Sequence, residues 1–84
     1  MTRKDAELLL DLEVKLLQAK TKHPTFPGNP KEGISIISEK FLELNEALLN
    51  LNRSINDEKA KEQLIEEAYH VAVTALRFVQ QVKK

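Results

Sequence analysis

One short segment that breaks helices divides this chain into long stretches that can be helical. The segment HPTFPGNPKEG, residues 23–33, holds all three prolines and both glycines of the protein. Proline lacks the backbone N–H that a helix needs, and glycine is costly in a helix interior, so we predict a loop here. No proline or glycine interrupts the rest of the chain, which is therefore predicted to be all-α.

Apolar residues recur at steps of three and four on both sides of this loop, as one face of a helix requires. The first helix is predicted over about residues 4–22. Its apolar face consists of Leu9, Leu12, Leu16 and Ala19. The second helix is predicted to follow Gly33 and to carry a continuous apolar seam. The seam consists of Ile34, Ile37, Phe41, Leu44, Leu48, Leu51 and Ile55.

A third helix is predicted over about residues 57–82, after a short polar turn at 52–57. Candidate capping residues in this turn are Ser54, Asn56 and Asp57. A turn this short favours antiparallel packing of the two helices that it joins. The third helix carries two parallel apolar rows, which indicates two packing neighbours. The rows are Leu64, Ala68, Val71, Ala75, Phe78 and Val82, and beside them Ile65, Tyr69, Ala72, Leu76 and Val79.

The length of the chain limits how much surface it can bury by itself. With 84 residues it forms one domain, residues 1–84, and buries only about 60–65% of the surface of its unfolded chain. It has no cysteine, so disulfides and thiolate metal sites cannot supply the missing stability. We therefore predict a four-helix-type bundle that the three-helix chain completes by dimerisation, as a homodimer or homotetramer.

The charge balance excludes several classes of partner. Thirteen basic residues balance thirteen acidic ones, so no basic field favours nucleic acid or an anionic membrane. No apolar run approaches the roughly 20 residues that span a bilayer. Acidic residues inside the first predicted helix argue against a secretory or transit signal. A cytoplasmic location is the expectation, without nucleic acid or membrane as partner.

Few catalytic chemistries have the residues that they need. The chain has no cysteine nucleophile, no glycine-rich phosphate loop and no serine on a strand-to-helix turn. His23 lies beside Pro24 at the end of the first predicted helix, where we expect a C-terminal cap. His70 remains as a candidate ligand because acidic residues surround it.

Two polar rows border the apolar faces of the second and third helices. They are Glu39, Glu43, Glu46, Asn50 and Arg53, and Gln63, Glu67, His70, Thr74 and Arg77. In an antiparallel pair these rows face each other near Glu43, Glu67 and His70, and facing carboxylates are how helical bundles bind hard divalent ions. The alternative is a solvated helix face, which a chain with 31% charged residues also shows.

The order of the segments resembles the MazG-like branch of the all-α nucleoside triphosphate pyrophosphohydrolases, particularly its short phage and bacterial members. The segments are a KHP-type loop, GISIISEKFLELNEAL and EEAYHVAVTALRF, and the resemblance covers about residues 18–79. It implies a single MazG-like domain that forms a dimer or a dimer of dimers. It also implies cleavage of nucleoside triphosphates to monophosphate and pyrophosphate with magnesium.

The resemblance further implies which residues form the site. The family motif E-E-x-x-E reads EKFLE here, so Glu39 and Glu43 match and Lys40 replaces a glutamate. The second motif, E-x-x-D, reads EAYH, so Glu67 matches and His70 replaces the aspartate. The implied metal ligands are Glu43 and Glu67, completed by His70, with Mg²⁺ or Mn²⁺ as the ion.

The remaining site residues are assigned on the same basis. Glu39 and Glu46 are expected to assist catalysis as outer ligands or by orienting water. The candidate phosphate contacts are Lys40, Lys22 and Lys31. Lys40 repels a dication, and the nitrogen of a histidine suits manganese or zinc better than magnesium. Lys40 either contacts phosphate directly or extends into solvent along its flexible stem.

Two functions follow for testing. The first is a divalent-metal-dependent nucleoside triphosphate pyrophosphohydrolase that binds a nucleoside triphosphate or a related phosphate compound, and in which the replacements at Lys40 and His70 weaken, alter or abolish activity. The alternative is a catalytically inactive helical module that acts in interaction or assembly through the seam of the second helix.

Overall fold

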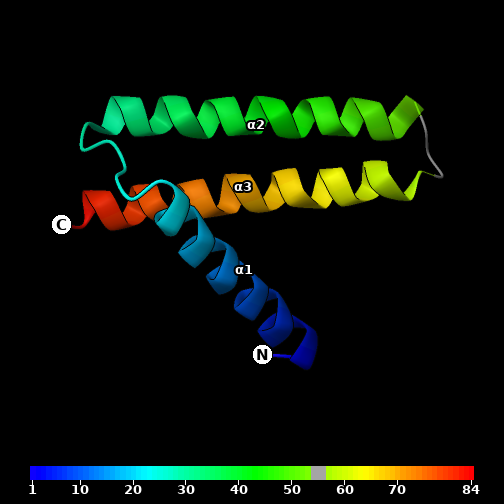
Figure 1. Cartoon of the computed structure of the whole chain (residues 1–84), viewed down its shortest axis with the longest axis horizontal. Coiled ribbons are helices and arrows are strands. Elements are labelled where there is room, and N and C mark those ends of the chain that lie inside the picture. The colour runs from blue at the N-terminus through cyan, green and yellow to red at the C-terminus, as the bar shows by residue number, and fades with distance from the viewer. Residues whose placement is uncertain (54–56) are drawn as a thin grey trace.

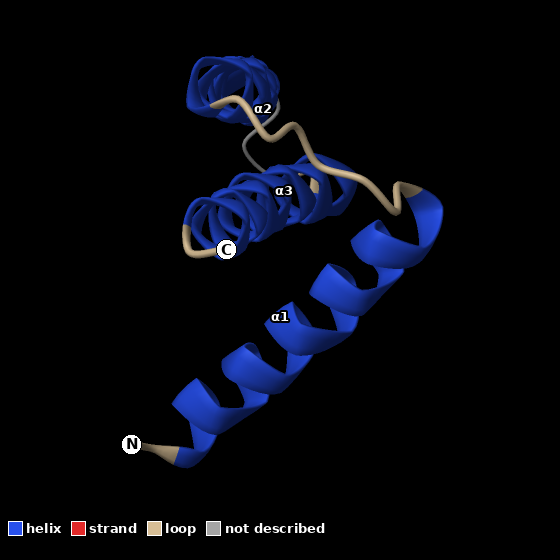
Figure 2. Ribbon diagram, turned by 90° about the vertical axis from the view of Figure 1, so that its left-hand side faces the viewer, coloured by secondary structure: helices blue, strands red, loops and turns tan. Residues whose placement is uncertain are grey.

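The computed structural model is all-helical and describes residues 1–53 and 57–84. Its elements are α1 (Arg3–Lys22), α2 (Pro30–Arg53) and α3 (Glu58–Val82). α2 and α3 run antiparallel, and α1 crosses α3 on the side away from α2 (Figures 1 and 2). The predicted all-α class and the predicted antiparallel pair are confirmed. Two of the predicted capping residues, Ser54 and Asn56, and the last residue of the predicted seam, Ile55, lie outside the described residues.

Local capping explains where the helices begin and end. The Thr2 hydroxyl accepts a hydrogen bond from the Asp5 N–H, and the Asp5 carboxylate accepts one from the Thr2 N–H. These reciprocal bonds satisfy two N–H groups at the start of α1. The Asp57 carboxylate accepts a hydrogen bond from the Lys59 N–H at 2.9 Å, which confirms Asp57 as the cap of α3. His23 is the C-cap of α1, as the sequence predicts.

The predicted loop at residues 23–33 is too long, because α2 already begins at Pro30. Proline is tolerated at the first helical position, where its missing N–H has no partner to lose. The Asn29 side chain accepts a hydrogen bond from the Lys31 N–H at 2.9 Å and so caps the helix start. Gly33 consequently lies inside α2, where it is buried against Phe78 and Phe26.

The predicted apolar seam of α2 is wrong in part. Ile37, Leu44 and Leu51 are half-buried, but Ile34 and Phe41 are each 53% exposed and Leu48 is also exposed. The face of α2 turned to α3 instead includes the buried small residues Gly33 and Ala47. These residues, which have little or no side chain, let the two helices approach closely, so the packed side of α2 combines Gly33 and Ala47 with the half-buried Ile37, Leu44 and Leu51, and it shares only these last three with the predicted seam.

The polar row of α3 is likewise not at the edge of the packing. Glu67, Thr74 and Arg77 are buried, and among the described residues they are more shielded than most apolar side chains. The only buried hydrophobic residues in the described ranges are Ala47 and Val73. The interior of the single chain is therefore small and polar, and much apolar surface remains exposed. Within residues 1–53 and 57–84, no helix combines the length and apolar character that a bilayer span requires.

Candidate metal centre

Glu43, Glu67 and His70 lie together between α2 and α3. Each offers one ligand atom, and the three atoms all lie within 4.8 Å of one another. Glu67 and His70 are three residues apart on α3, and the antiparallel packing of α2 and α3 brings Glu43 of α2 opposite them. The structure thus brings together the three residues predicted to hold a metal ion.

Glu67 is the best shielded member of this cluster, with 7% exposure. Its Oε1 accepts a hydrogen bond from Gln63 Nε2 at 2.8 Å, which fixes the carboxylate. Its Oε2 lies 3.4 Å from His70 Nδ1. Both of these atoms are shielded from solvent, and neither has a hydrogen-bond partner among the described residues. A buried acceptor left without a partner costs about 1–3 kcal/mol, so this pair of atoms is suited to a bound cation.

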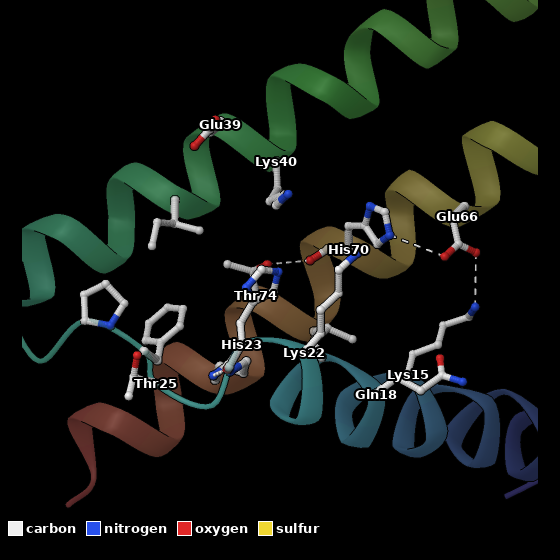
Figure 3. Close-up of a pocket in the computed structure, with 16 residues that line it drawn as sticks. Lys15, Gln18, Lys22, His23, Thr25, Glu39, Lys40, Glu66, His70 and Thr74 are labelled. Carbon is white, nitrogen blue, oxygen red and sulfur yellow. Dashed lines mark hydrogen bonds and ion pairs between the residues drawn. The ribbon is translucent and has the colours of Figure 1, made fainter.

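A second carboxylate holds the other side of the His70 ring. Nε2 of His70 lies 3.3 Å from Glu66 Oε1, and Glu66 Oε2 accepts a hydrogen bond from Lys15 Nζ at 3.1 Å (Figure 3). This hydrogen bond and the charge of Lys15, with a smaller contribution from His70, hold the pKa of Glu66 below its usual range although partial burial acts in the opposite direction. A carboxylate on one ring nitrogen of a ligating histidine orients the other nitrogen towards the metal.

Lys40 lies at the same site and pairs with a cluster member. Its Nζ is 3.6 Å from Glu43 Oε2, and its side chain is about one-third exposed. Figure 3 shows Lys40 directed from α2 into the space between the helices. Of the two alternatives for Lys40, the structure favours the cleft over full extension into solvent.

A cleft of about 540 Å³ opens beside the cluster, between the end of α1, the following loop, α2 and α3. Its lining includes His70, Lys40, Glu39 and Lys22 of the predicted site residues (Figure 3). A volume of this size is typical of small-molecule sites. The cleft and the cluster share His70, so a ligand in the cleft lies next to the candidate metal position.

Two of the predicted site residues lie elsewhere. Glu46 is exposed on α2 and belongs neither to the cluster nor to the lining of the cleft. Lys31 is exposed in the first turn of α2 and does not line the cleft either. The catalytic role of Glu46 and the phosphate contact of Lys31 remain predictions that the geometry does not favour.

Sequence reasoning missed three residues at the site. Lys15 and Glu66 join α1 to α3, and Arg77 donates a hydrogen bond from Nη2 to the His23 carbonyl at 2.6 Å. The guanidinium carbon of Arg77 also lies 5.4 Å from the centre of the Phe26 ring. Two signals were available: Lys15 interrupts the apolar face of α1 between Leu12 and Leu16, and Arg77 ends the polar row that also contains Glu67 and His70.

No family model matches the chain, and neither a curated protein nor a solved structure matches it.

Proposed function

We propose that this chain binds a divalent metal ion at Glu43, Glu67 and His70 and hydrolyses nucleoside triphosphates to monophosphate and pyrophosphate. The observation that carries the metal site is the convergence of three ligand atoms within 4.8 Å of one another, beside a buried Glu67 oxygen that has no hydrogen-bond partner among residues 1–53 and 57–84. The choice of reaction comes from the resemblance of EKFLE and EAYH to the motifs of the MazG-like family.

The donor set favours manganese or zinc over magnesium. Two carboxylates and one imidazole make a mixed oxygen and nitrogen site, whereas magnesium prefers oxygen ligands alone. Three protein ligands leave a position open for substrate, as catalytic zinc sites require. A divalent ion here would polarise a phosphoryl oxygen as a Lewis acid.

The residues around the cluster have separate roles in this proposal. Gln63 holds one oxygen of Glu67, and Glu66 orients the His70 ring from its far side. Glu39 is exposed on the wall of the cleft, where its carboxylate is available to accept a proton from water. Lys40 would compete with the metal for Glu43, so we expect a weaker metal affinity than three uncompensated ligands would give.

The test is pyrophosphate release from a panel of deoxynucleoside triphosphates with Mn²⁺, Zn²⁺ or Mg²⁺. We expect Mn²⁺ to support more activity than Mg²⁺. The substitution Glu67→Gln should reduce the rate by about a hundredfold or more, because loss of an outer-shell partner alone costs 10–100-fold. The matched control is Glu62→Gln, which removes an exposed carboxylate from the same helix outside the cluster. Absence of pyrophosphate release with every ion, or equal loss in both variants, would contradict the proposed activity.

We also propose that two copies associate through one apolar flank of α2 and α3. Ile34, Phe41 and Leu48 are exposed along one side of α2. Val79 and Val82 are exposed on α3, and helical periodicity puts them on the same side of the antiparallel pair. None of these five residues lines the cleft, so dimerisation through them leaves its lining residues uncovered. Covering the flank with the same flank of a second chain gives the four-helix bundle that the single chain lacks.

The same flank favours a second candidate function, a catalytically inactive assembly module. In that case the chain dimerises, or binds another apolar helix pair, without binding metal. Metal binding separates the two functions: titration calorimetry with Mn²⁺ and Zn²⁺ gives heat for the hydrolase and none for the assembly module.

A further inference from the structure

Each of the three helices contributes a cationic side chain to the cleft beside the Glu43, Glu67 and His70 cluster. Lys15 and Lys22 come from α1, Lys40 from α2 and Arg77 from α3. The acidic residues of the lining are Glu39 and Glu66. The wall of the cleft is therefore more basic than the chain as a whole, which carries no net charge.

Two of these cations have no acidic counterpart in the part of the chain that the structure describes. Lys15 pairs with Glu66, and Lys40 with Glu43. Within the described ranges, neither Lys22 nor Arg77 has a carboxylate within 4.0 Å. Arg77 is only 9% exposed, and its partners are the neutral His23 carbonyl and the Phe26 ring. A buried charge without a counter-charge is costly, so the cleft is suited to an anion from outside the chain.

Lys40 connects this cleft to the metal ligands. Its ammonium lies 3.6 Å from Glu43 Oε2, an oxygen of the cluster, while its side chain also lines the cleft. A divalent cation at Glu43 repels the ammonium and competes for the same carboxylate. The lysine stem is flexible, so the displaced ammonium can move further into the cleft. In Figure 3, Lys22 extends from the end of α1 towards α3 on the opposite wall.

We propose that the cleft binds a tetrahedral oxyanion such as phosphate or sulfate through Lys22 and Arg77, and that Lys40 couples this site to the metal site. When a divalent cation takes Glu43, the released Lys40 ammonium joins the oxyanion, and each ligand raises the affinity of the other. The coupling rests on the proposed metal site. The oxyanion site itself depends neither on metal nor on hydrolysis.

The experiment is a titration of the ¹⁵N-labelled full chain with sodium sulfate, followed by two-dimensional NMR against sodium chloride of equal ionic strength. Zn²⁺ is the metal because it is diamagnetic and does not precipitate with sulfate. Without metal, we expect sulfate to shift the amide signals around the cleft, and Lys22→Met to weaken this binding severalfold. Saturating Zn²⁺ should raise the sulfate affinity at least about fivefold, and sulfate should raise the zinc affinity by the same factor.

Two lysine substitutions separate coupling by Lys40 from simple attraction between Zn²⁺ and sulfate. Lys40→Met keeps most of the apolar stem of the side chain but removes the ammonium that competes for Glu43. This variant should bind Zn²⁺ more tightly than the wild type. The factor by which Zn²⁺ raises its sulfate affinity, the coupling factor, should be smaller. Lys20→Met makes the same charge change on α1 outside the cleft and should match the wild type.

Three results would overturn parts of this proposal. Loss of sulfate binding in Lys20→Met equal to that in Lys22→Met would overturn the oxyanion site. An unchanged coupling factor in Lys40→Met would overturn the role of Lys40. Failure of the wild type to bind Zn²⁺ would overturn the coupling and the proposed metal site together, whereas zinc binding without pyrophosphate release would overturn only the hydrolase.

Discussion

At the scale of single residues, the site depends on charges that are shared between neighbouring groups. His70 lies between two carboxylates, with Glu66 on one ring nitrogen and Glu67 on the other. Glu66 is in turn held by Lys15, and Glu43 by Lys40. The two lysines therefore hold two of the carboxylates around His70, and the proposed metal ion would compete with Lys40 for Glu43.

The lowered pKa of Glu66 predicts the direction in which the stability difference between wild type and Lys15→Met changes with pH. Because Lys15 is the main cause of the lowered value, Lys15→Met should raise the pKa of Glu66 towards the ordinary carboxyl range. The ion pair stabilises the fold at neutral pH, and this contribution is lost as pH falls through the lowered pKa. The stability difference between wild type and variant should therefore shrink on acidification. The measurements are a carboxyl ¹³C NMR titration and urea unfolding at several pH values.

The effect of Lys15→Met on Glu66 is compared with that of a lysine substitution elsewhere on the surface, and the contact of Lys15 with Tyr69 is considered apart from the ion pair. Lys61→Met removes a lysine that pairs with Glu58 on the same helix, so it should leave the pKa of Glu66 unchanged. Lys15 also lies 5.0 Å from the centre of the Tyr69 ring, and loss of this contact lowers stability at every pH. A Glu66 pKa that stays low in Lys15→Met would show that Lys15 is not its cause.

The sequence predicts the cluster of Glu43, Glu67 and His70, but it does not predict the contacts that α1 and the following loop make beside this cluster. Glu67 and His70 adjoin because any α-helix brings residues three apart together, and a short turn places Glu43 opposite them. The pairing of Lys15 with Glu66, and of Arg77 with the His23 carbonyl, depends on how α1 crosses α3. The sequence carries no direct signal for that crossing, so these contacts were not predicted.

At the scale of the elements, the close approach of α2 and α3 explains why the predicted seam was wrong in part. Apolar periodicity reports which side of a helix avoids water, but not which neighbour covers it. Small residues in α2 allow α3 to approach at Gly33 and Ala47, and the larger apolar residues Ile34 and Phe41 are left beside the contact. The helices themselves were predictable because capping and periodicity are local, whereas their contact faces are not.

Gly33 should be hard to replace although it lies in a helix. A Cβ atom at Gly33 would lie 2.7 Å from Phe78 Cδ2 and 3.3 Å from Phe26 Cε1. Alanine gains about 1 kcal/mol in helix propensity over glycine, but overpacking costs about 1–3 kcal/mol, so we expect Gly33→Ala to lower stability by up to about 2 kcal/mol. Urea unfolding followed by circular dichroism measures this change.

Gly28→Ala is the matched control for this substitution. A Cβ atom at Gly28 meets only the Gln81 side-chain nitrogen at 3.5 Å, which is an ordinary contact distance. Its stability should be close to that of the wild type. If Gly33→Ala were as stable as the wild type, the close packing of α2 on α3 at this point would be refuted.

At the scale of the whole molecule, the single chain exposes more surface than a compact domain of its size. Its accessible surface is 6537 Å², against about 5,100 Å² expected for its mass. The radius of gyration is 14.2 Å, against about 12 Å expected for 84 residues. The excess surface is larger than the roughly 800 Å² that each partner buries in a standard interface. These values support the proposed dimer.

Sedimentation velocity at micromolar concentration should show a species of twice the chain mass. Phe41→Glu places a charge in the middle of the exposed flank of α2 and should give a monomer, because burying an unpaired charge in an apolar interface is costly. Leu42→Glu changes the next residue, which is also exposed but turned by about 100° around the helix, and should remain dimeric. A monomeric wild type, or equal dissociation in both variants, would rule out association through this flank.

The central claim is that Glu43, Glu67 and His70 hold one divalent ion. Crystals grown with Mn²⁺ and measured near the manganese absorption edge test it directly, because an anomalous difference map locates the ion without reference to activity. We predict one peak within coordination distance of a carboxylate oxygen of each glutamate and of His70 Nδ1. We also predict that Lys40 Nζ moves away from Glu43 and that the peak is lost in Glu67→Gln. A map without a peak at this cluster at saturating Mn²⁺ would contradict this claim.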